Sequence, residues 1–344
     1  MPASRLLRSP LLQQVRFPWY VARQLTRLAG EYDVADCSSG DGWVYQSIRR
    51  ENRLLMVARS HGLEHIVDSV FREEVASGKQ KQSWKYPLYH GGYRLREVAR
   101  SFRTADVCIF PNQGDLEFAV ERLGVKAEKA VIVPNGIPDE FVGLPLRNAN
   151  RMTEQLRVAI VGSYSHRKIN VAPQALNRVL QANPALRIGF LGTGVSEDSV
   201  LQDYSREYHE RINVLPRYSH SSLPSLLADY DVLLFPSLSE GFGLVVYEAM
   251  ACGLAVIATD LSALQTYLTH EEDVFFIARN KPEAIEAALF RLIREPGLLS
   301  HLQQRGWMKA QRFAWSKIAA DTRALYEEFV ARKAASDTRA QNTE

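Results

Sequence analysis

Two glutamates, Glu240 and Glu248, flank a glycine-rich turn in the segment SEGFGLVVYEAMACGLAVIAT, residues 239–259. The first follows the apolar run 231–236, and the second lies about one turn inside a predicted helix that ends at Gly253. Glycines let backbone amides approach a bound group, and a helix start favours a diphosphate. A carboxylate there can accept two hydroxyl hydrogens, as from a ribose. The segment therefore predicts a nucleotide-diphosphate-sugar site, with Glu248 on the ribose and Glu240 towards the sugar.

These residues need a sheet to position them, and the chain has a suitable pattern. Short apolar or β-branched runs alternate with amphipathic stretches that have helical spacing. Several runs are apolar at nearly every position, as in strands buried on both faces. This alternation predicts an α/β fold with parallel sheets and right-handed crossovers. The predicted strands are 32–37, 54–59, 106–110, 130–134, 157–162, 187–192, 231–236, 254–259 and 274–278.

A polar stretch without periodicity, residues 143–156, separates the two series of strands and predicts a domain boundary. We expect two Rossmann-like domains whose strand carboxyl ends face a central cleft. The predicted parts are an N-terminal acceptor-side domain over 1–145, a donor-binding domain over 151–312, a C-terminal helix over 313–332 that packs back on the domains, and a disordered tail over 333–344.

Composition narrows the class of protein. The 344 residues carry a formal net charge of +3, with 46% hydrophobic and 24% charged residues. This is ordinary for a globular protein, and the charge is too small to indicate nucleic-acid binding. Three scattered cysteines, Cys37, Cys108 and Cys252, lie in or beside apolar segments. They predict reduced core residues and a cytoplasmic protein.

The first thirty residues contain five arginines, no acidic residue and the cluster FPWY. Three interpretations of this segment stay open: a transit peptide, a basic helix that touches a membrane, and a surface helix that leads into the first strand. We favour the surface helix. Peripheral contact with the inner membrane face remains a hypothesis.

The chain resembles the retaining glycosyltransferases of family 4, the glycosyl transferases group 1, which have the GT-B fold. The resemblance rests on LPSLLADYDVLLFPSLSEGFGLVVYEAMACGLAVIATD, on ADVCIFPNQGDLEFAVERLGV and on VIVPNGIPDEF. It implies transfer of a hexosyl group from a UDP- or GDP-sugar to a glycan or lipid-linked acceptor, with retention of anomeric configuration. It implies no metal and no cofactor besides the nucleotide-sugar donor.

The resemblance also implies roles for individual residues. In the family, the glutamate at the position of Glu240 contacts the transferred sugar, and the one at Glu248 contacts the ribose. A lysine matches at Lys168, but Ser163 stands where arginine is usual, and Arg167 is a candidate for the missing charge. Fixed cations and amides would stabilise the departing diphosphate. The implied donor-binding residues are Gly162, Ser163, Arg167, Lys168, Gly241, Phe242, Gly243, Leu244 and Glu248.

A histidine near the sugar is the remaining catalytic candidate, beside Glu240 and Lys168. His61 follows a predicted strand and precedes Gly62, which places it on a loop at the carboxyl end of that strand. In the family, a histidine in such a place helps to orient the sugar. A satisfied structural histidine is the alternative.

The resemblance fails at two places. The family begins with a strand and a glycine-rich loop, but the first glycine here is Gly30, just before a strand that matches a later one in the family. The first N-terminal βα units are therefore expected to be absent from this sequence, either because the true start lies upstream or because the protein is a natural truncation with a reduced acceptor domain. The segment 261–268, LSALQTYL, also lacks the glycines and glutamate often found there.

The sequence leaves other functions open. A catalytically inactive nucleotide-sugar-binding or regulatory protein, derived from a truncated transferase, is the main alternative. A nicotinamide-dependent dehydrogenase would need a Gly-x-Gly-x-x-Gly turn, of which only Gly192 and Gly194 are present. HGLEH, 61–65, has the spacing of an inverted zinc-protease motif, but Gly62 is a poor helix interior. Asp229 and Asp231 resemble an Asp-x-Asp metal motif, yet we expect them to cap the sheet or face solvent.

Overall fold

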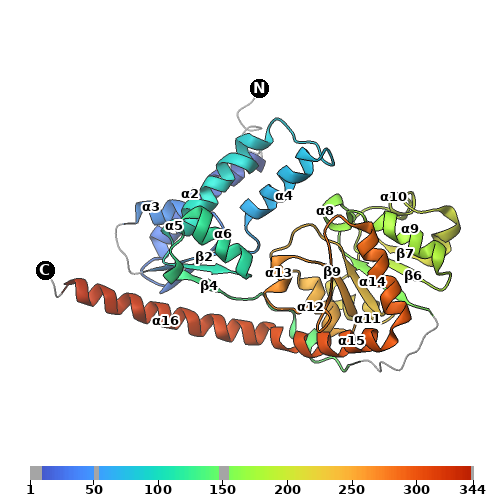
Figure 1. The fold of residues 1–344 in the computed structure, drawn as a ribbon. Helices are drawn as coiled ribbons and strands as arrows, with labels where there is room; N and C mark the ends of the chain where they lie inside the picture. Colours follow the sequence, from blue (N-terminus) through green and yellow to red (C-terminus); the bar gives the residue numbers. More distant parts are fainter. Residues whose placement is uncertain (1–9, 50–53, 147–154, 342–344) are drawn as a thin grey trace. The chain divides into compact units, whose positions relative to one another are not determined.

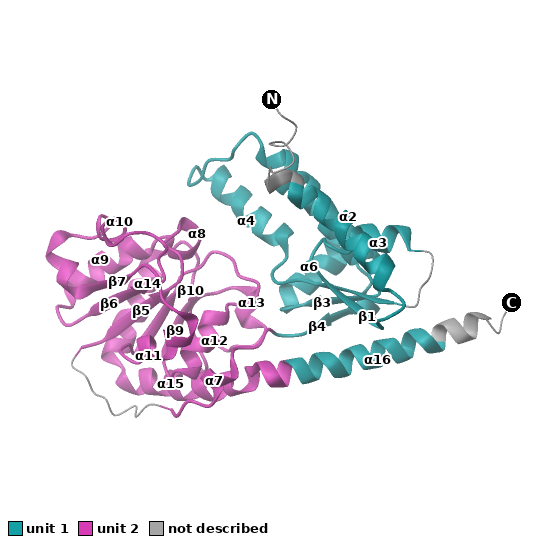
Figure 2. Cartoon of the chain, turned by 180° about the vertical axis from the view of Figure 1, so that it is seen from behind, with its two compact units in different colours: residues 1–134, 319–344 teal, residues 135–318 magenta. Residues whose placement is uncertain are grey.

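The computed structural model describes residues 10–49, 54–146 and 155–341. The chain forms two compact units (Figures 1 and 2). Unit 1 comprises residues 1–134 together with the chain from Ala319 onward, and unit 2 comprises Asn135–Ile318. Each unit contains one sheet, and every strand pair in both sheets is parallel.

Unit 1 has a four-stranded sheet in the order β1-β2-β3-β4. One face of the sheet packs on the helices between the strands, where Ala58, Cys108 and Phe110 meet Phe102 of α5. The elements of this unit are α2 (Pro10–Leu28), β1 (Val34–Ser38), α3 (Trp43–Ile48), β2 (Leu55–Arg59), α4 (Glu64–Ala76), α5 (Leu95–Thr104), β3 (Val107–Phe110), α6 (Gln113–Leu123) and β4 (Ala130–Ile132), with short helical turns at Tyr86–Leu88, Tyr89–Arg94 and Ala127–Lys129.

The last helix of the chain is α16 (Trp315–Gln341), and it belongs to unit 1 from Ala319 onward. Tyr326 accepts a hydrogen bond from Arg59 and donates one to Asp36, while Lys333 Nζ donates to Asp106 Oδ2 at 2.6 Å. The prediction of disorder is wrong for 333–341. This part of the chain has no glycine or proline and is rich in helix formers, and the Lys333 ion pair holds its start. Residues 342–344 lie outside the described residues.

Unit 2 has a six-stranded sheet in the order β10-β9-β8-β5-β6-β7. Alternate residues of the strands face two separate cores, so that Val158 and Ile160 pack with α9 and α14 while Ala159 and Val161 pack with α11 and α12. Its strands are β5 (Arg157–Val161), β6 (Arg187–Leu191), β7 (Ile212–Leu215), β8 (Val232–Phe235), β9 (Ala255–Thr259) and β10 (Phe275–Ile277). Its helices are α7 (Asp139–Val142), α8 (His166–Ile169), α9 (Ala172–Ala182), α10 (Glu197–Leu201), α11 (Leu223–Leu227), α12 (Leu244–Ala251), α13 (Ser262–Gln265), α14 (Pro282–Arg294) and α15 (Pro296–Ala310), with short helical turns at Arg206–Arg211, His220–Ser222 and Gln311–Phe313.

The predicted strands are confirmed to within one or two residues, and β7 is the strand that the prediction missed. The division of the chain differs from the predicted boundary, because unit 2 begins at Asn135 and not near residue 150. Ile137 and Phe141 are fully buried in the core of unit 2, and the Ile137 amide donates to the carbonyl of Phe313. The central part of the predicted linker, 147–154, lies outside the described residues.

Candidate active site

The sheet order of unit 2 identifies the edge where a ligand is expected. Numbered within the unit, the strands run 3-2-1-4-5-6, so the order reverses between β5 and β8. In open α/β sheets, ligands bind outside the carboxyl ends of the strands at such a switch point. The segments that follow β5 and β8 carry Gly162–Lys168 and Ser237–Gly243, so the sheet brings these predicted donor residues to one edge.

The loop after β5 is tied to the loop after β8. Gly162 has a φ of 117°, a conformation that L side chains rarely adopt, and it turns the chain out of the strand. Arg167 Nη1 donates to the carbonyl oxygen of Ser239 at 3.0 Å, and the Leu238 amide donates to the carbonyl of Arg167. Ser163 is exposed, and its Oγ lies 3.3 Å from Ser165 Oγ. Arg167 therefore reaches the glutamate loop, whereas the side chain of Ser163 contributes no charge.

Lys168 and Glu240 form the charged centre of the site. Lys168 Nζ donates to Glu240 Oε1, and Ser237 Oγ donates to the same oxygen at 2.5 Å. The side chains are 22% and 13% exposed, respectively, so both are largely shielded from water while their polar ends meet. Lys168 Nζ also lies 5.2 Å from the ring centroid of Phe235. The two predicted catalytic residues of this unit are in direct contact.

The glycine-rich turn ends at the start of α12. Gly243 has a φ of 81°, so the turn needs a residue without a Cβ here, and Leu244 begins the helix. The unbonded amides of the first helical turn favour an anion. Phe242 is buried and stacks on Tyr247 with ring centroids 4.4 Å apart. Its side chain therefore belongs to the core, and any ligand contact from this predicted donor residue would come from its backbone.

Glu248 lies on α12 and is almost fully buried. His220 Nε2 is 2.9 Å from Glu248 Oε1, in the loop that follows β7. Burial raises the pKa of Glu248 above its usual range, and the hydrogen bond and charge of His220 oppose this rise. Tyr218 lies in the same loop, and its pKa is raised by burial and by Glu248. Glu248 is thus a buried acceptor with a histidine partner, and its contact with a ribose stays a prediction.

His61 is in unit 1, on the loop between β2 and α4, and its side chain is exposed. Asp115 holds this loop, because its Oδ2 accepts from the Leu63 amide at 2.7 Å and from Ser60 Oγ at 3.3 Å. Burial raises the pKa of Asp115 to about 6. The structure thus confirms the predicted place of His61 at a strand carboxyl end, within its own unit.

The two metal-like motifs have structural explanations. His61 lies outside α4, which begins at Glu64, so His61 and His65 do not share a helix. Asp231 Oδ2 accepts from the Arg157 amide at 2.9 Å, at the amino end of β5, the opposite end of the sheet from the candidate site. Within 10–49, 54–146 and 155–341, no group of three or more His, Cys, Asp or Glu residues is placed to hold a metal ion.

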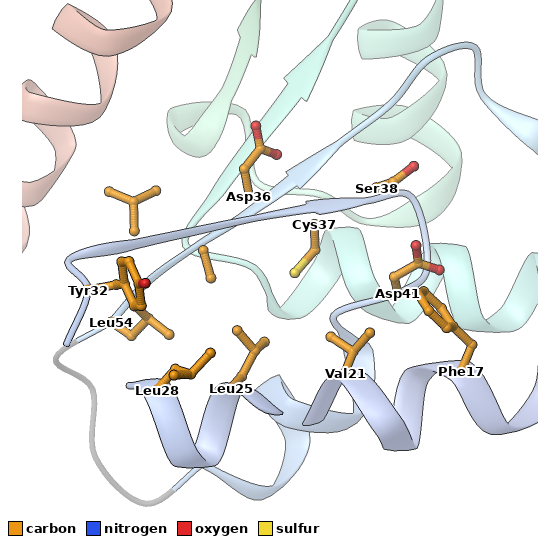
Figure 3. Close-up of a pocket in the computed structure, with 12 residues that line it drawn as sticks. Phe17, Val21, Leu25, Leu28, Tyr32, Asp36, Cys37, Ser38, Asp41 and Leu54 are labelled. Carbon is orange, nitrogen blue, oxygen red and sulfur yellow. The ribbon is translucent and has the colours of Figure 1, made fainter. Parts of the chain in front are cut away.

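A pocket of about 320 Å³ lies between α2 and β1 in unit 1 (Figure 3). Val21 and Leu25 of α2 line it on one side, and Cys37 of β1 lines it on the other. Burial raises the pKa of Cys37 to about 12, so its thiol is uncharged at neutral pH. The residues that line the pocket include none of the predicted site residues.

Three polar residues of the candidate site were not predicted from the sequence. Ser237 precedes Glu240 by only three positions, so a contact between the two side chains was a local possibility. Ser239 Oγ is buried without a hydrogen-bond partner in the described part of the chain. His220 is 28 residues from Glu248 in sequence, so its contact depends on how the β7 loop meets α12.

Comparison with known proteins places the two units in families. Residues 155–295 match the family model described as glycosyl transferases group 1, and residues 2–141 match the one described as glycosyltransferase family 4. A D-inositol 3-phosphate glycosyltransferase of Salinispora tropica is 32% identical over 122 residues, covering 36% of this chain and 25% of that protein. A phosphatidyl-myo-inositol mannosyltransferase of Mycolicibacterium smegmatis is 26% identical over 202 residues, covering 58% of this chain and 52% of that protein. The chain thus matches between about a quarter and a half of these relatives' length.

Solved structures agree with the fold. Sucrose-phosphate synthase of Thermosynechococcus elongatus superposes with a TM-score of 0.73 at 21% identity, covering 96% of this chain and 81% of that one. HepE of Anabaena, solved in complex with UDP, superposes with a TM-score of 0.67 at 18% identity, covering 90% and 82%. Identities this low establish the fold alone. The two family models together match most of the sequence, and the chain therefore belongs to the group 1 and family 4 glycosyltransferases, with the two Rossmann-like units of the GT-B fold.

Proposed function

We propose that this protein transfers a hexosyl group from a UDP- or GDP-sugar to a glycan or lipid-linked acceptor, with retention at the anomeric carbon. The observation that carries the proposal is the contact of Lys168 with Glu240, and of Arg167 with the carbonyl of Ser239, at the switch point of the unit 2 sheet, beside the start of α12. A cation, a carboxylate and free helix amides are what the diphosphate and sugar of such a donor need.

Each residue has a role in this proposal. Lys168, Arg167 and the amides of Gly243 and Leu244 bind the diphosphate and stabilise its charge as the bond to the sugar breaks. Glu240 accepts hydrogen bonds from the sugar hydroxyls, and Glu248 accepts them from the ribose. The leaving phosphate takes the proton of the incoming hydroxyl on the same face of the sugar, which retains the configuration. We assign orientation of the sugar to His61 on the family resemblance, and the proposed chemistry requires no metal.

The relatives support the substrate classes. HepE was solved with UDP, and the Mycolicibacterium smegmatis relative is named for mannosyl transfer to a phosphatidyl-inositol. A nucleotide-diphosphate donor and a lipid-linked acceptor are therefore reasonable first probes for this chain. The site is also compatible with the alternative of binding without transfer, because Ser163 supplies no charge at a position where the family has arginine.

A thermal-shift panel with UDP, GDP, ADP, their sugar conjugates and NAD(H) tests the proposal. A ligand at about one hundred times its dissociation constant adds roughly 2.7 kcal/mol of stability, which is readily measured. We expect stabilisation by one nucleotide diphosphate and its sugar conjugate, followed by release of the diphosphate on incubation with acceptor. Stabilisation without release would favour the binding-protein alternative, and no stabilisation by any nucleotide diphosphate would refute the donor site.

We further propose that α2 makes peripheral contact with an anionic membrane surface on the cytoplasmic side. Trp19 and Tyr20 are 57% and 60% exposed, and they share a helix face with the exposed Arg16, Arg23 and Arg27. Aromatic and basic residues together suit the headgroup region. Arg5 and Arg8, which belong to the same basic segment, lie outside the described residues. No described helix is long and apolar enough to cross a bilayer.

Vesicle co-sedimentation tests this contact. We expect binding to vesicles that contain phosphatidylserine and little binding to pure phosphatidylcholine, and we expect Arg23→Glu/Arg27→Glu to abolish the difference. Equal sedimentation with both vesicle types, or an unchanged double variant, would contradict the proposal.

A further inference from the structure

The surroundings of Glu248 contain more than a carboxylate for ribose. Among the described residues, His220 is its hydrogen-bond partner, with Nε2 at 2.9 Å from Oε1. The Glu248 side chain is 7% exposed, whereas that of His220 is 52% exposed. One carboxylate oxygen is thus held from the solvent side, and a ligand would meet the other.

Packing on Phe141 and a hydrogen bond orient the ring of His220. His220 begins the short 3-10 turn His220–Ser222 between β7 and α11, and its ring lies 5.6 Å from that of Phe141. Phe141 is fully buried, so it forms a rigid surface for the imidazole. Packing from one side and a hydrogen bond on the other restrict the histidine to the orientation seen.

We propose that His220 is a positioning residue of the nucleotide site, which donates through Nε2–H to Glu248 Oε1 and so orients the carboxylate for the ribose hydroxyls. The inference rests on the proposed function, because it concerns the same donor site. Ribose affinity then depends on a residue of the β7–α11 loop, outside the glycine-rich turn and α12.

The electrostatics of the site support this role. Among the described residues, the titratable groups that interact with Glu248 are His220 and Tyr218, both from the loop after β7. Burial raises the pKa of Glu248, and His220 counteracts the rise. Without His220, a larger fraction of Glu248 is protonated at mildly acidic pH. A protonated carboxyl accepts hydroxyl hydrogens less well.

Isothermal titration with UDP and GDP, from pH 5.5 to 8.0, tests the proposal. For the nucleotide that the wild type binds, we expect His220→Ala to raise the dissociation constant about tenfold at neutral pH, the cost of one hydrogen bond to a charged group. As the pH is lowered, the His220→Ala variant should begin to lose nucleotide affinity at a higher pH than the wild type does. His220→Gln keeps an N–H donor near the position of Nε2, and it should restore affinity at neutral pH to within about threefold.

Two controls separate positioning from loss of structure. His301→Ala removes an exposed histidine of α15 in the same unit, and its affinity should equal that of the wild type. In the Glu248→Gln background, removing His220 should add little, since the histidine acts through the carboxylate.

The outcomes distinguish the two proposals. A wild type that binds no nucleotide diphosphate overturns the proposed function and this inference together. Wild-type binding that Glu248→Gln weakens but His220→Ala leaves unchanged at every pH overturns this inference alone. Equal, additive losses from His220→Ala in both backgrounds would show that the histidine does not act through Glu248.

Discussion

Replacing Lys168 by methionine removes the cation at the centre of the proposed site and keeps most of its volume. The lysine and Glu240 are in contact, and their side chains are 22% and 13% exposed. In an effective dielectric constant of about 20, unit charges 4 Å apart attract by about 4 kcal/mol, most of which is offset by desolvation. Glu240 keeps its hydrogen bond from Ser237, so it is not left without a partner.

From these terms we expect Lys168→Met to lower the free energy of unfolding by about 1–2 kcal/mol, less than the roughly 3–5 kcal/mol of a fully buried pair. For a unit of this size, that corresponds to a melting-temperature decrease of about 2–8 °C. The effect on the rate should be larger. Loss of one group that stabilises a developing oxyanion typically costs about 100- to 1000-fold in kcat.

The assay measures release of nucleotide diphosphate from the sugar nucleotide that stabilises the protein, per mole of folded protein. Lys309→Met is the matched control, because Lys309 Nζ lies 3.2 Å from Asp273 Oδ2 in the same unit, with side chains 23% and 4% exposed. This control should lose comparable stability and keep the wild-type rate. A Lys168→Met rate within threefold of the wild type, or an equal rate loss in Lys309→Met, would refute the catalytic role.

Three further predictions concern other parts of the structure. Gly243→Ala forces a side chain into the left-handed region and places a Cβ 3.1 Å from Leu264, so the free energy of unfolding, measured by chemical denaturation, should fall by about 1–2 kcal/mol. The control Gly297→Ala lies in open space on α15 and should not lower the free energy of unfolding. Because the folded-state pKa of Asp115 is raised to about 6, its stabilising contribution is full below about pH 4 and is lost as the pH rises through 6. Asp115→Asn should therefore remove about 2–3 kcal/mol of pH dependence between pH 4 and 7 in urea titrations, and an unchanged slope would contradict the assignment. His61→Ala should lower the transfer rate about tenfold or more. Its melting temperature should not change, since the side chain is exposed. A lower melting temperature with an unchanged rate per folded molecule would show that the role of His61 is structural.

The strands next to the site could be predicted because each is marked by its own short run of apolar residues. β5 and β8 are apolar on both faces, as a central parallel strand requires, and the glycine-rich turn follows β8 directly. β7 escaped prediction because it is an edge strand of four residues with an exposed Asn213, followed at once by Pro216. Its pattern is too short and too polar to separate from a loop.

Contacts that join distant segments were beyond sequence reasoning. The boundary near 150 was expected from a polar stretch, but Ile137 and Phe141 are buried by packing on residues such as Phe313. In the same way, the Lys168–Glu240 pair joins residues 72 positions apart. Spacing could place both at the carboxyl edge of the sheet, and only the three-dimensional packing could bring their charges together.

The substitution at Ser163 can be judged from the charges that the structure does assemble. Lys168 and Arg167 are both cations, and Glu240 is the anion in contact with Lys168, so these three groups carry a net charge of +1 before a ligand binds. Arg167 donates to the neutral carbonyl of Ser239, and no ion pair compensates its charge within the described part of the chain. Together with the amides at the start of α12, this is the charge pattern that a diphosphate requires. A serine at 163 therefore removes one phosphate contact but not the positive potential of the site, and we expect weakened donor affinity and not its loss.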